Sequence, residues 1–292
     1  MKKIVVTGAT GKQGSATVYE LLEHDFEVIA LTRNPQSAEA QRLKNAGAAL
    51  AEGDLENIES LKNILEKVDG LYLVLPPVWI SSTETDEKEA ELGIQILKLA
   101  EEQGVKFVLY SSVLASDKQD LFRPRFKFTI EKYLLESNLQ GAILRPASFM
   151  ENLLMPSFGL GNGTFINPLP GETAISWVAT KDIGTFARII FQNYTEFNGK
   201  TVDFGGELVT PKEILKLLEE KLHQPIDFVQ VPLEVLYEQS KTFARLVEMI
   251  ANEGYDPIDY NFIASWMPEL ISLEKWMDEI GIEKIKELQC NV

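Results

Sequence analysis

Residues 4–14 read Ile-Val-Val-Thr-Gly-Ala-Thr-Gly-Lys-Gln-Gly, so a short apolar run leads straight into three glycines. The segment that follows, 15–23, carries apolar residues at helical spacing. This order predicts a strand, a glycine turn and a helix. Gly8 permits the tight turn, Gly11 lets the backbone approach a phosphate, and Gly14 lets the helix lie close to the strand. Because free N–H groups and the helix dipole both attract phosphate, the stretch predicts a site for a dinucleotide pyrophosphate.

The glycines are spaced GxxGxxG rather than GxGxxG, and such a pattern is weakly specific by itself. Its context decides the interpretation, because it follows an apolar strand and further strand–helix units come after it. The predicted cofactor-binding residues of this loop are Gly8, Thr10, Gly11, Lys12, Gln13 and Gly14.

The first half of the chain alternates short apolar runs with helical patterns. Further strands are expected at 26–31, 48–51, 71–75 and 106–110 and from residue 142, and helices at 36–46, 58–68, 86–104 and 127–137. This alternation predicts an α/β fold with a Rossmann-type, doubly wound parallel sheet. Right-handed crossovers then place the carboxyl ends of the strands, and the ligand crevice, along one edge.

The regular alternation of strands and helices ends after residue 150, where a loop rich in Gly, Asn and Pro spans 159–171. A strand at 175–178, a helix at 181–192 and a strand at 200–204 follow, and Thr210-Pro211 is a typical helix start. A strand is expected at 226–231, before a mostly helical remainder. We predict that 1–150 together with about 175–205 form the nucleotide-binding domain. Residues 151–174 and 206–292 would form a smaller, interleaved α/β domain for a substrate or partner.

Composition and charge narrow the classes of function. Of the 292 residues 45% are hydrophobic, no apolar run is long enough to cross a bilayer, and no leader peptide is evident. The single cysteine, Cys290, excludes a disulfide framework, and we expect no metal site and a cytoplasmic location. A net charge of −16 disfavours direct nucleic-acid binding, which relies on Lys and Arg.

Arg33, at the end of the second expected strand, occupies the place where NAD-preferring sites carry an acidic residue. A guanidinium matches a 2′-phosphate in charge and shape, so we expect NADP(H) to be preferred over NAD(H), with Lys12 as a second cation. The alternative is a solvated arginine at a strand end. Asp54 and Leu55 follow the third strand, where Asp54 would face the adenine or cap the next helix. Leu75 and Pro76 would lie beside the nicotinamide ribose, unless Pro76 merely ends a strand.

Five stretches then resemble the NmrA-like family, a group of atypical short-chain dehydrogenase/reductase relatives. They are residues 7–14, 31–35, 53–54, 110–112 and 145–153, the last reading Arg-Pro-Ala-Ser-Phe-Met-Glu-Asn-Leu; 273–276 is also similar. The resemblance covers nearly the whole chain. It implies a nucleotide domain, a small C-terminal domain, and a cleft between them to which Phe149 and Asn152 would contribute.

The wider superfamily's catalytic pattern is a Ser followed by Tyr-x-x-x-Lys. Lys127 matches the lysine and Ser111 or Ser112 the serine, but Arg123 stands where the tyrosine is expected. The resemblance therefore implies Lys127 and Ser112 as catalytic residues and Ser111 and Lys127 as cofactor contacts. Lys127 could transfer a proton, could only bind the ribose, or could form a solvated i, i+4 pair with Glu131.

Two functions remain open on these residues. The first is an NAD(P)H-dependent reductase of quinone-like small molecules, which need little acid help from the protein. The second is a non-catalytic NADP(H) sensor that acts through a regulatory protein partner. The missing tyrosine favours the sensor, whereas Lys127 and Ser112 leave catalysis open.

Overall fold

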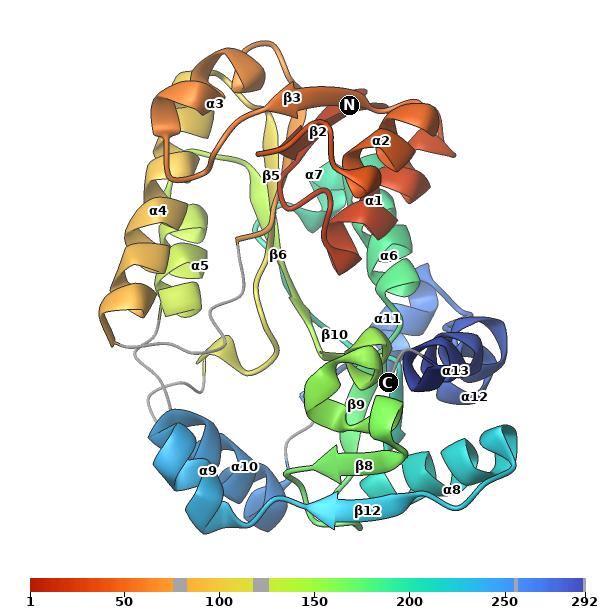
Figure 1. Ribbon diagram of the computed structural model, residues 1–292. Helices are drawn as coiled ribbons and strands as arrows, with labels where there is room; N and C mark the ends of the chain where they lie inside the picture. The colour runs from red at the N-terminus through yellow and green to blue at the C-terminus, as the bar shows by residue number, and fades with distance from the viewer. Residues whose placement is uncertain (76–82, 118–125, 255–256, 291–292) are drawn as a thin grey trace. The chain divides into compact units, whose positions relative to one another are not determined.

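The computed structural model describes residues 1–75, 83–117, 126–254 and 257–290. The described residues form two compact units, and the chain passes between them several times (Figure 1). Unit 1 comprises 1–117, 126–146 and 180–203, and unit 2 comprises 147–179 and 204–290. The segment 175–179 thus belongs to unit 2.

Unit 1 is built on a sheet whose described strands lie in the order β10-β6-β5-β4-β1-β2-β3. The strands from β1 to β6 pair in parallel. Strand β10 is also parallel to β6, as the hydrogen bonds from Ile143 N–H to Lys200 O and from Ala147 N–H to Phe204 O show. This order is that of the doubly wound fold, so the predicted fold class is confirmed. The strands are β1 Lys3–Val6, β2 Glu27–Thr32, β3 Ala49–Glu52, β4 Gly70–Leu73, β5 Phe107–Ser111, β6 Gly141–Pro146 and β10 Thr201–Phe204.

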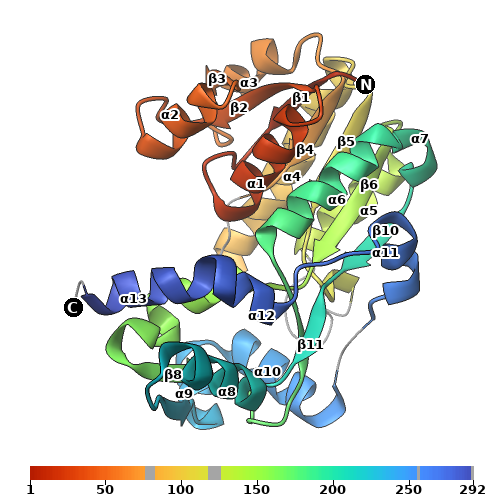
Figure 2. The same cartoon turned by 90° about the vertical axis from the view of Figure 1, so that its right-hand side faces the viewer.

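Helices cover both faces of this sheet (Figures 1 and 2). One face carries α1 and α6 side by side, and the other carries α4 and α5. The α1–α6 crossing requires Gly184, because a Cβ there would lie 2.7 Å from the Ala16 carbonyl. The helices are α1 Lys12–Leu22, α2 Ala38–Asn45, α3 Ile58–Leu65, α4 Thr83–Glu102, α5 Phe126–Glu136, α6 Thr180–Gln192 and α7 Tyr194–Phe197.

Because both faces are covered, the central strands are mostly apolar and buried, as parallel strands in such sheets are. Strand β4 nevertheless ends two residues before the end of the apolar run 71–75. The Thr7 hydroxyl accepts the Val74 N–H and donates to the Val74 carbonyl, both at 2.7 Å. A side chain therefore replaces the neighbouring strand as the partner of Val74, and the expected strand is shorter than its apolar pattern.

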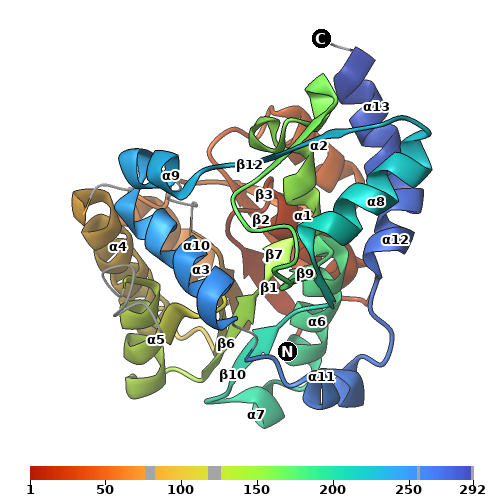
Figure 3. The same cartoon turned by 90° about the horizontal axis from the view of Figure 1, so that it is seen from below.

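Unit 2 contains two small sheets and most of the remaining helices (Figure 3). Strands β7 Ser148–Phe149, β9 Ile175–Val178 and β11 Glu207–Val209 form one sheet, and β8 Thr164–Asn167 pairs in parallel with β12 Asp227–Gln230. Helix α9 lies beside α10. The helices are α8 Pro211–Leu222, α9 Leu233–Gln239, α10 Lys241–Glu253, α11 Tyr260–Trp266, α12 Leu273–Trp276 and α13 Ile282–Cys290, with 3-10 turns between 150 and 162 and a π turn at Met277–Gly281.

The helix start expected at Thr210-Pro211 is present. Thr210 caps α8 by accepting the Glu213 N–H, and the Glu213 carboxylate accepts the Thr210 N–H in return. Within unit 2, Phe165 and Trp177 are buried in the hydrophobic core, where Phe158 packs against both. None of the helices in the described part of the chain combines the length and the apolar character that a bilayer crossing needs.

Candidate functional site

The glycine loop between β1 and α1 folds tightly onto the helix that follows it. Gly8 has a φ of +56°, and the Gly11 N–H donates to the Gly8 carbonyl at 2.9 Å. A Cβ on Gly14 would lie 2.1 Å from the Gly8 oxygen and 2.6 Å from its carbonyl carbon. Position 14 therefore tolerates no side chain while the loop keeps this form, because the helix start lies against the loop backbone.

The start of α1 carries neither a side-chain cap nor an acidic residue of its own. Its N-cap residue is Gly11. In contrast, Ser37 caps α2 and Thr210 caps α8 with their side chains. Because the first N–H groups of a helix have no acceptor within it and carry the positive end of the dipole, this end is suited to a phosphate.

The loop also lies at the point where the strand order reverses. Strands β1 and β4 are neighbours, and from there the chain proceeds outward in both directions. In open α/β sheets the ligand crevice lies outside the carboxyl ends of the strands at this point. Leu75, two residues beyond β4, is buried there. Pro76 lies outside the described residues.

Gln13 connects the glycine loop to the sheet. Its side-chain oxygen accepts hydrogen bonds from the Tyr72 hydroxyl at 3.1 Å and the Ser111 hydroxyl at 2.7 Å. Burial raises the pKa of Tyr72 to about 12, so this phenol stays a neutral donor. The side chains of two predicted cofactor contacts, Gln13 and Ser111, thus bond to each other. The next serine differs, because the Ser112 hydroxyl is buried without a hydrogen-bond partner among the described residues.

Arg33 and Asp54 follow neighbouring strands. Arg33 is exposed after β2 and makes no hydrogen bond or ion pair with any described residue. Asp54 follows β3, and its carboxylate accepts the Glu56 N–H at 3.1 Å. The alternative that Asp54 caps the next helix is wrong, because Asn57 is the N-cap residue of α3.

The remaining loop residues have simpler surroundings. Leu55 packs half-buried against the core beneath β3. Thr10 is half-buried in the glycine loop, and Lys12 is exposed at the first position of α1.

Lys127 lies in the first turn of α5, near the carboxyl end of β5. Its ammonium forms an ion pair with Glu89 of α4 at 2.5 Å, and the two side chains are 19% and 8% exposed. The expected solvated pair of Lys127 with Glu131 is wrong. Glu131 is 1% exposed and bound by Arg145, so the face of α5 that carries it points inward.

Arg145 is the centre of a buried charged cluster at the end of β6. Its Nη2 donates to Glu131 Oε2 at 2.6 Å, and its Nη1 lies 3.3 Å from Asp117 and 3.6 Å from Asp203. Burial raises the pKa of Asp203, with Asp117 and Glu131 adding to the shift against the opposing effect of Arg145. The motif at 145–153 does not predict this role for Arg145; the one local signal is an arginine within an apolar strand.

Phe149 and Asn152 belong to unit 2. Phe149 is half-buried in β7, and Asn152 lies in the 3-10 turn that follows it. In the same turn Glu151 accepts a hydrogen bond from the Trp276 indole at 3.1 Å. Whether Phe149 and Asn152 bind cofactor stays a prediction.

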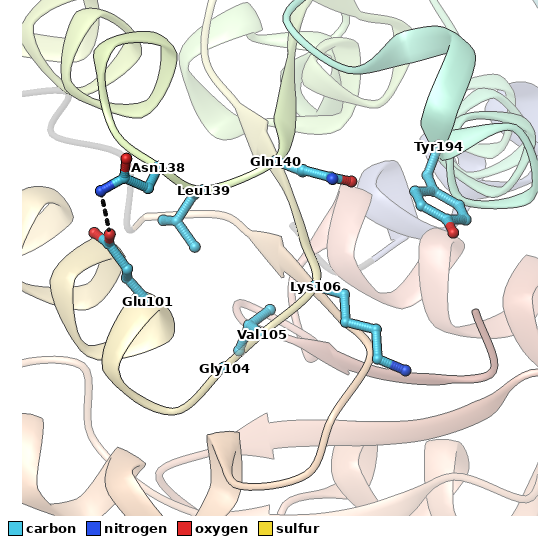
Figure 4. Close-up of a pocket in the computed structure, with 8 residues that line it drawn as sticks. All are labelled: Glu101, Gly104, Val105, Lys106, Asn138, Leu139, Gln140 and Tyr194. Carbon is cyan, nitrogen blue, oxygen red and sulfur yellow. Dashed lines mark hydrogen bonds between the residues drawn. The ribbon is translucent and has the colours of Figure 1, made fainter.

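A pocket of about 400 Å³ lies elsewhere in unit 1 (Figure 4). Lys106 and Gln140 on its wall directly precede β5 and β6, so the pocket opens at the amino ends of the strands. Ligands of doubly wound sheets bind at the opposite ends. The lining residues are Glu101, Gly104, Val105, Lys106, Asn138, Leu139, Gln140 and Tyr194.

Comparison with known sequences places this arrangement in a family. The sequence model of the NmrA-like family matches residues 1–278. The chain belongs to the NmrA-like family. The resemblance noted in the sequence is thereby confirmed.

Similar NmrA-like proteins carry several descriptions. The chain is 28% identical to an NAD(P)H azoreductase from Xenophilus azovorans, covering 88% of each protein. It is 28% identical to quinone oxidoreductase 2 from Escherichia coli strain K12, covering 70% of this chain and 68% of the relative. The crystal structure of NmrA, a negative transcriptional regulator, in complex with NADP superposes with a TM-score of 0.77 at 18% identity over 98% of each chain, which shows the shared fold.

Proposed function

We propose that this chain is an NADP(H)-dependent oxidoreductase that reduces flat, uncharged acceptors such as quinones. The observation that carries the proposal is the glycine loop before α1, whose helix start has neither a side-chain cap nor an acidic residue. A Cβ at position 14 would collide with the loop backbone, so the form of the loop depends on glycine there. These features fit a dinucleotide, with its pyrophosphate at residues 8–14.

The preference for NADP(H) rests on Arg33. The described residues give this exposed arginine no carboxylate, although the chain holds 44 acidic residues against 28 basic ones. At the end of β2 it occupies the place from which a ribose 2′-phosphate would be bound. Its fork of N–H donors matches that phosphate, and Lys12 would add a second positive charge. Asp54 has one carboxylate oxygen engaged by Glu56 and would accept from the adenine amino group.

Lys127 and Ser112 would assist the reduction as hydrogen-bond donors. A bound nicotinamide would supply the hydride. The Ser112 hydroxyl, buried without a partner among the described residues, would donate to the oxygen of the acceptor. Lys127, held by Glu89, would donate to the ribose or to the same oxygen. Quinones suit this site because their reduced oxygen is a weak base, so the tyrosine missing at position 123 is not required.

Two relatives support the substrate class, because their descriptions name an azoreductase and a quinone oxidoreductase. The test is oxidation of NADPH and of NADH, followed by nicotinamide absorbance, with a panel of quinones. Arg33→Gln should weaken NADP binding about 10-fold to 100-fold and leave NAD binding unchanged, since a charge-assisted bond to phosphate is lost. Arg42→Gln is the matched control, because Arg42 is an exposed arginine of α2 that pairs with Glu39. Equal effects of Arg33→Gln on both nucleotides would refute the selectivity.

A non-catalytic NADP(H) sensor in the cytoplasm, acting through a protein partner rather than by binding nucleic acid directly, is the second candidate. The observation in its favour is Arg123 in place of the proton-donating tyrosine. Tight NADP binding without turnover of any acceptor would favour the sensor and refute the reductase.

A further inference from the structure

The ion pair between Lys127 and Glu89 differs from the other lysine pairs near it. The pair joins α5 to α4 at 2.5 Å, and both side chains are largely buried. One turn further along α5, Lys132 and Glu136 lie 3.8 Å apart and are 57% and 71% exposed. Exposed pairs of that kind contribute little, whereas a buried pair fixes both side chains.

Among the described carboxylates, Glu89 pairs with Lys127, whereas the one closest to it on α5 is bound elsewhere. Glu131 is closer in sequence, but it accepts from Arg145 and from the Ser116 hydroxyl at 2.5 Å. Beneath the pair, burial and then the charges of Glu89 and Glu131 raise the pKa of Tyr110 well above its ordinary value. Among the described residues, Glu89 and Glu131 therefore both act on the phenol of Tyr110, and Glu131 is already paired with Arg145.

We propose that Glu89 is a positioning residue that holds the Lys127 ammonium in place, so that Lys127 serves as an oriented hydrogen-bond donor in the proposed reaction. The expected effect on turnover rests on the proposed reductase function. The positioning of Lys127 by Glu89 rests only on the geometry of the ion pair. Lys127 donates a hydrogen bond and transfers no proton; the quinone receives one hydride from the nicotinamide, and the resulting anion takes its proton from water.

The first test needs no turnover. Trace acetylation at pH 8, quantified by mass spectrometry, measures how readily Lys127 reacts relative to Lys132 in the same molecule. An amine held in a buried ion pair is shielded from the reagent, so Glu89→Gln, which removes the pair, should raise the relative reactivity of Lys127 about tenfold. Glu136→Gln, which breaks the exposed pair on the same helix, should leave Lys127 unchanged. Equal reactivity in the wild type and in Glu89→Gln would overturn the proposal.

The second test uses turnover of NADPH with a quinone. In Glu89→Gln, kcat should fall about tenfold with the KM for the quinone little changed, because the hydrogen-bond donor is no longer held in place. In a Lys127→Ala background Glu89→Gln should have no added effect. A loss of kcat in Glu89→Gln that persists in that background would show a merely structural role and overturn the proposal. If the wild type binds NADPH but reduces no acceptor, the reductase fails, and the acetylation result alone decides the role of Glu89.

Discussion

Replacing Arg145 with leucine should destabilise unit 1 more than any surface change. Arg145 is 7% exposed, and its Nε and Nη2 both donate to the carboxylate of Glu131, a residue that is 1% exposed. Its Nη1 also lies near Asp117 and Asp203. Arg145→Leu would therefore leave one fully buried carboxylate and two partly buried ones without their common cation.

The size of the effect follows from the burial. Removing one partner of a buried ion pair costs about 3–5 kcal/mol, because the remaining charge keeps its desolvation penalty and loses the compensating attraction. The Ser116 hydroxyl still donates to Glu131 and offsets a small part of this loss. Since domains are stable by about 5–15 kcal/mol, the loss is a large share of the total.

Urea unfolding followed by far-UV circular dichroism at pH 7 measures this loss. The double variant Glu131→Leu/Arg145→Leu should lose less than the sum of the two single variants, since it removes both charges and fills the space with apolar groups. Lys132→Gln breaks an exposed pair on α5 and serves as the control, with an expected change within about 0.5 kcal/mol. A loss below about 1 kcal/mol for Arg145→Leu, or additive losses in the double variant, would refute the reasoning.

Three further predictions concern other parts of the molecule. Gly14→Ala places a Cβ 2.1 Å from a backbone oxygen of the glycine loop, so NADPH affinity, measured by fluorescence titration, should fall about 100-fold, whereas Gly171→Ala, in open space, should bind normally. The hydrogen bond and charge of Lys106, with two backbone N–H groups, hold the pKa of Asp69 well below its usual range. The stability from Asp69 is therefore present above about pH 4 and lost as the pH falls below it, and in Asp69→Asn the urea midpoint should vary less across that window. Burial raises the pKa of Asp203, so the native state binds that proton more tightly and stability is lost as the pH rises through the raised value. The stability of Asp203→Asn relative to the wild type should therefore be higher at pH 8 than at pH 4, and the opposite order would contradict the assignment.

The sheet of unit 1 could be predicted because its signals are local. Each strand is a run of four to six mostly apolar residues that a glycine, a proline or a polar turn brings to an end. The limits of these elements were less predictable. The apolar run through Val74 and Leu75 reads as strand, yet the Thr7 hydroxyl takes both backbone groups of Val74. A side chain far away in sequence decided the boundary.

The partners of charged residues could not be predicted for a related reason. Spacing on α5 makes Glu131 the obvious partner of Lys127, but spacing contains no information about which other cation competes for that carboxylate. Arg145 of β6 binds Glu131, and Lys127 pairs instead with Glu89, 38 residues earlier. Gln13 could be placed in the glycine loop from its spacing, but its bonds to Tyr72 and Ser111 depend on the neighbouring strands.

The pairing of Lys127 also bears on which acceptors the proposed reductase can use. Hydride addition to a simple ketone produces an alkoxide, a strong base that must receive a proton as it forms. Addition to a quinone produces a phenolate whose charge is delocalised over the ring. Lys127 is held in an ion pair with Glu89, which leaves it a poor proton source but an adequate hydrogen-bond donor. Position 123 carries no tyrosine that could supply the proton instead. This geometry therefore disfavours the reduction of simple ketones and favours acceptors whose reduced anion is stable. Turnover of ketones at rates equal to those of quinones would contradict this argument.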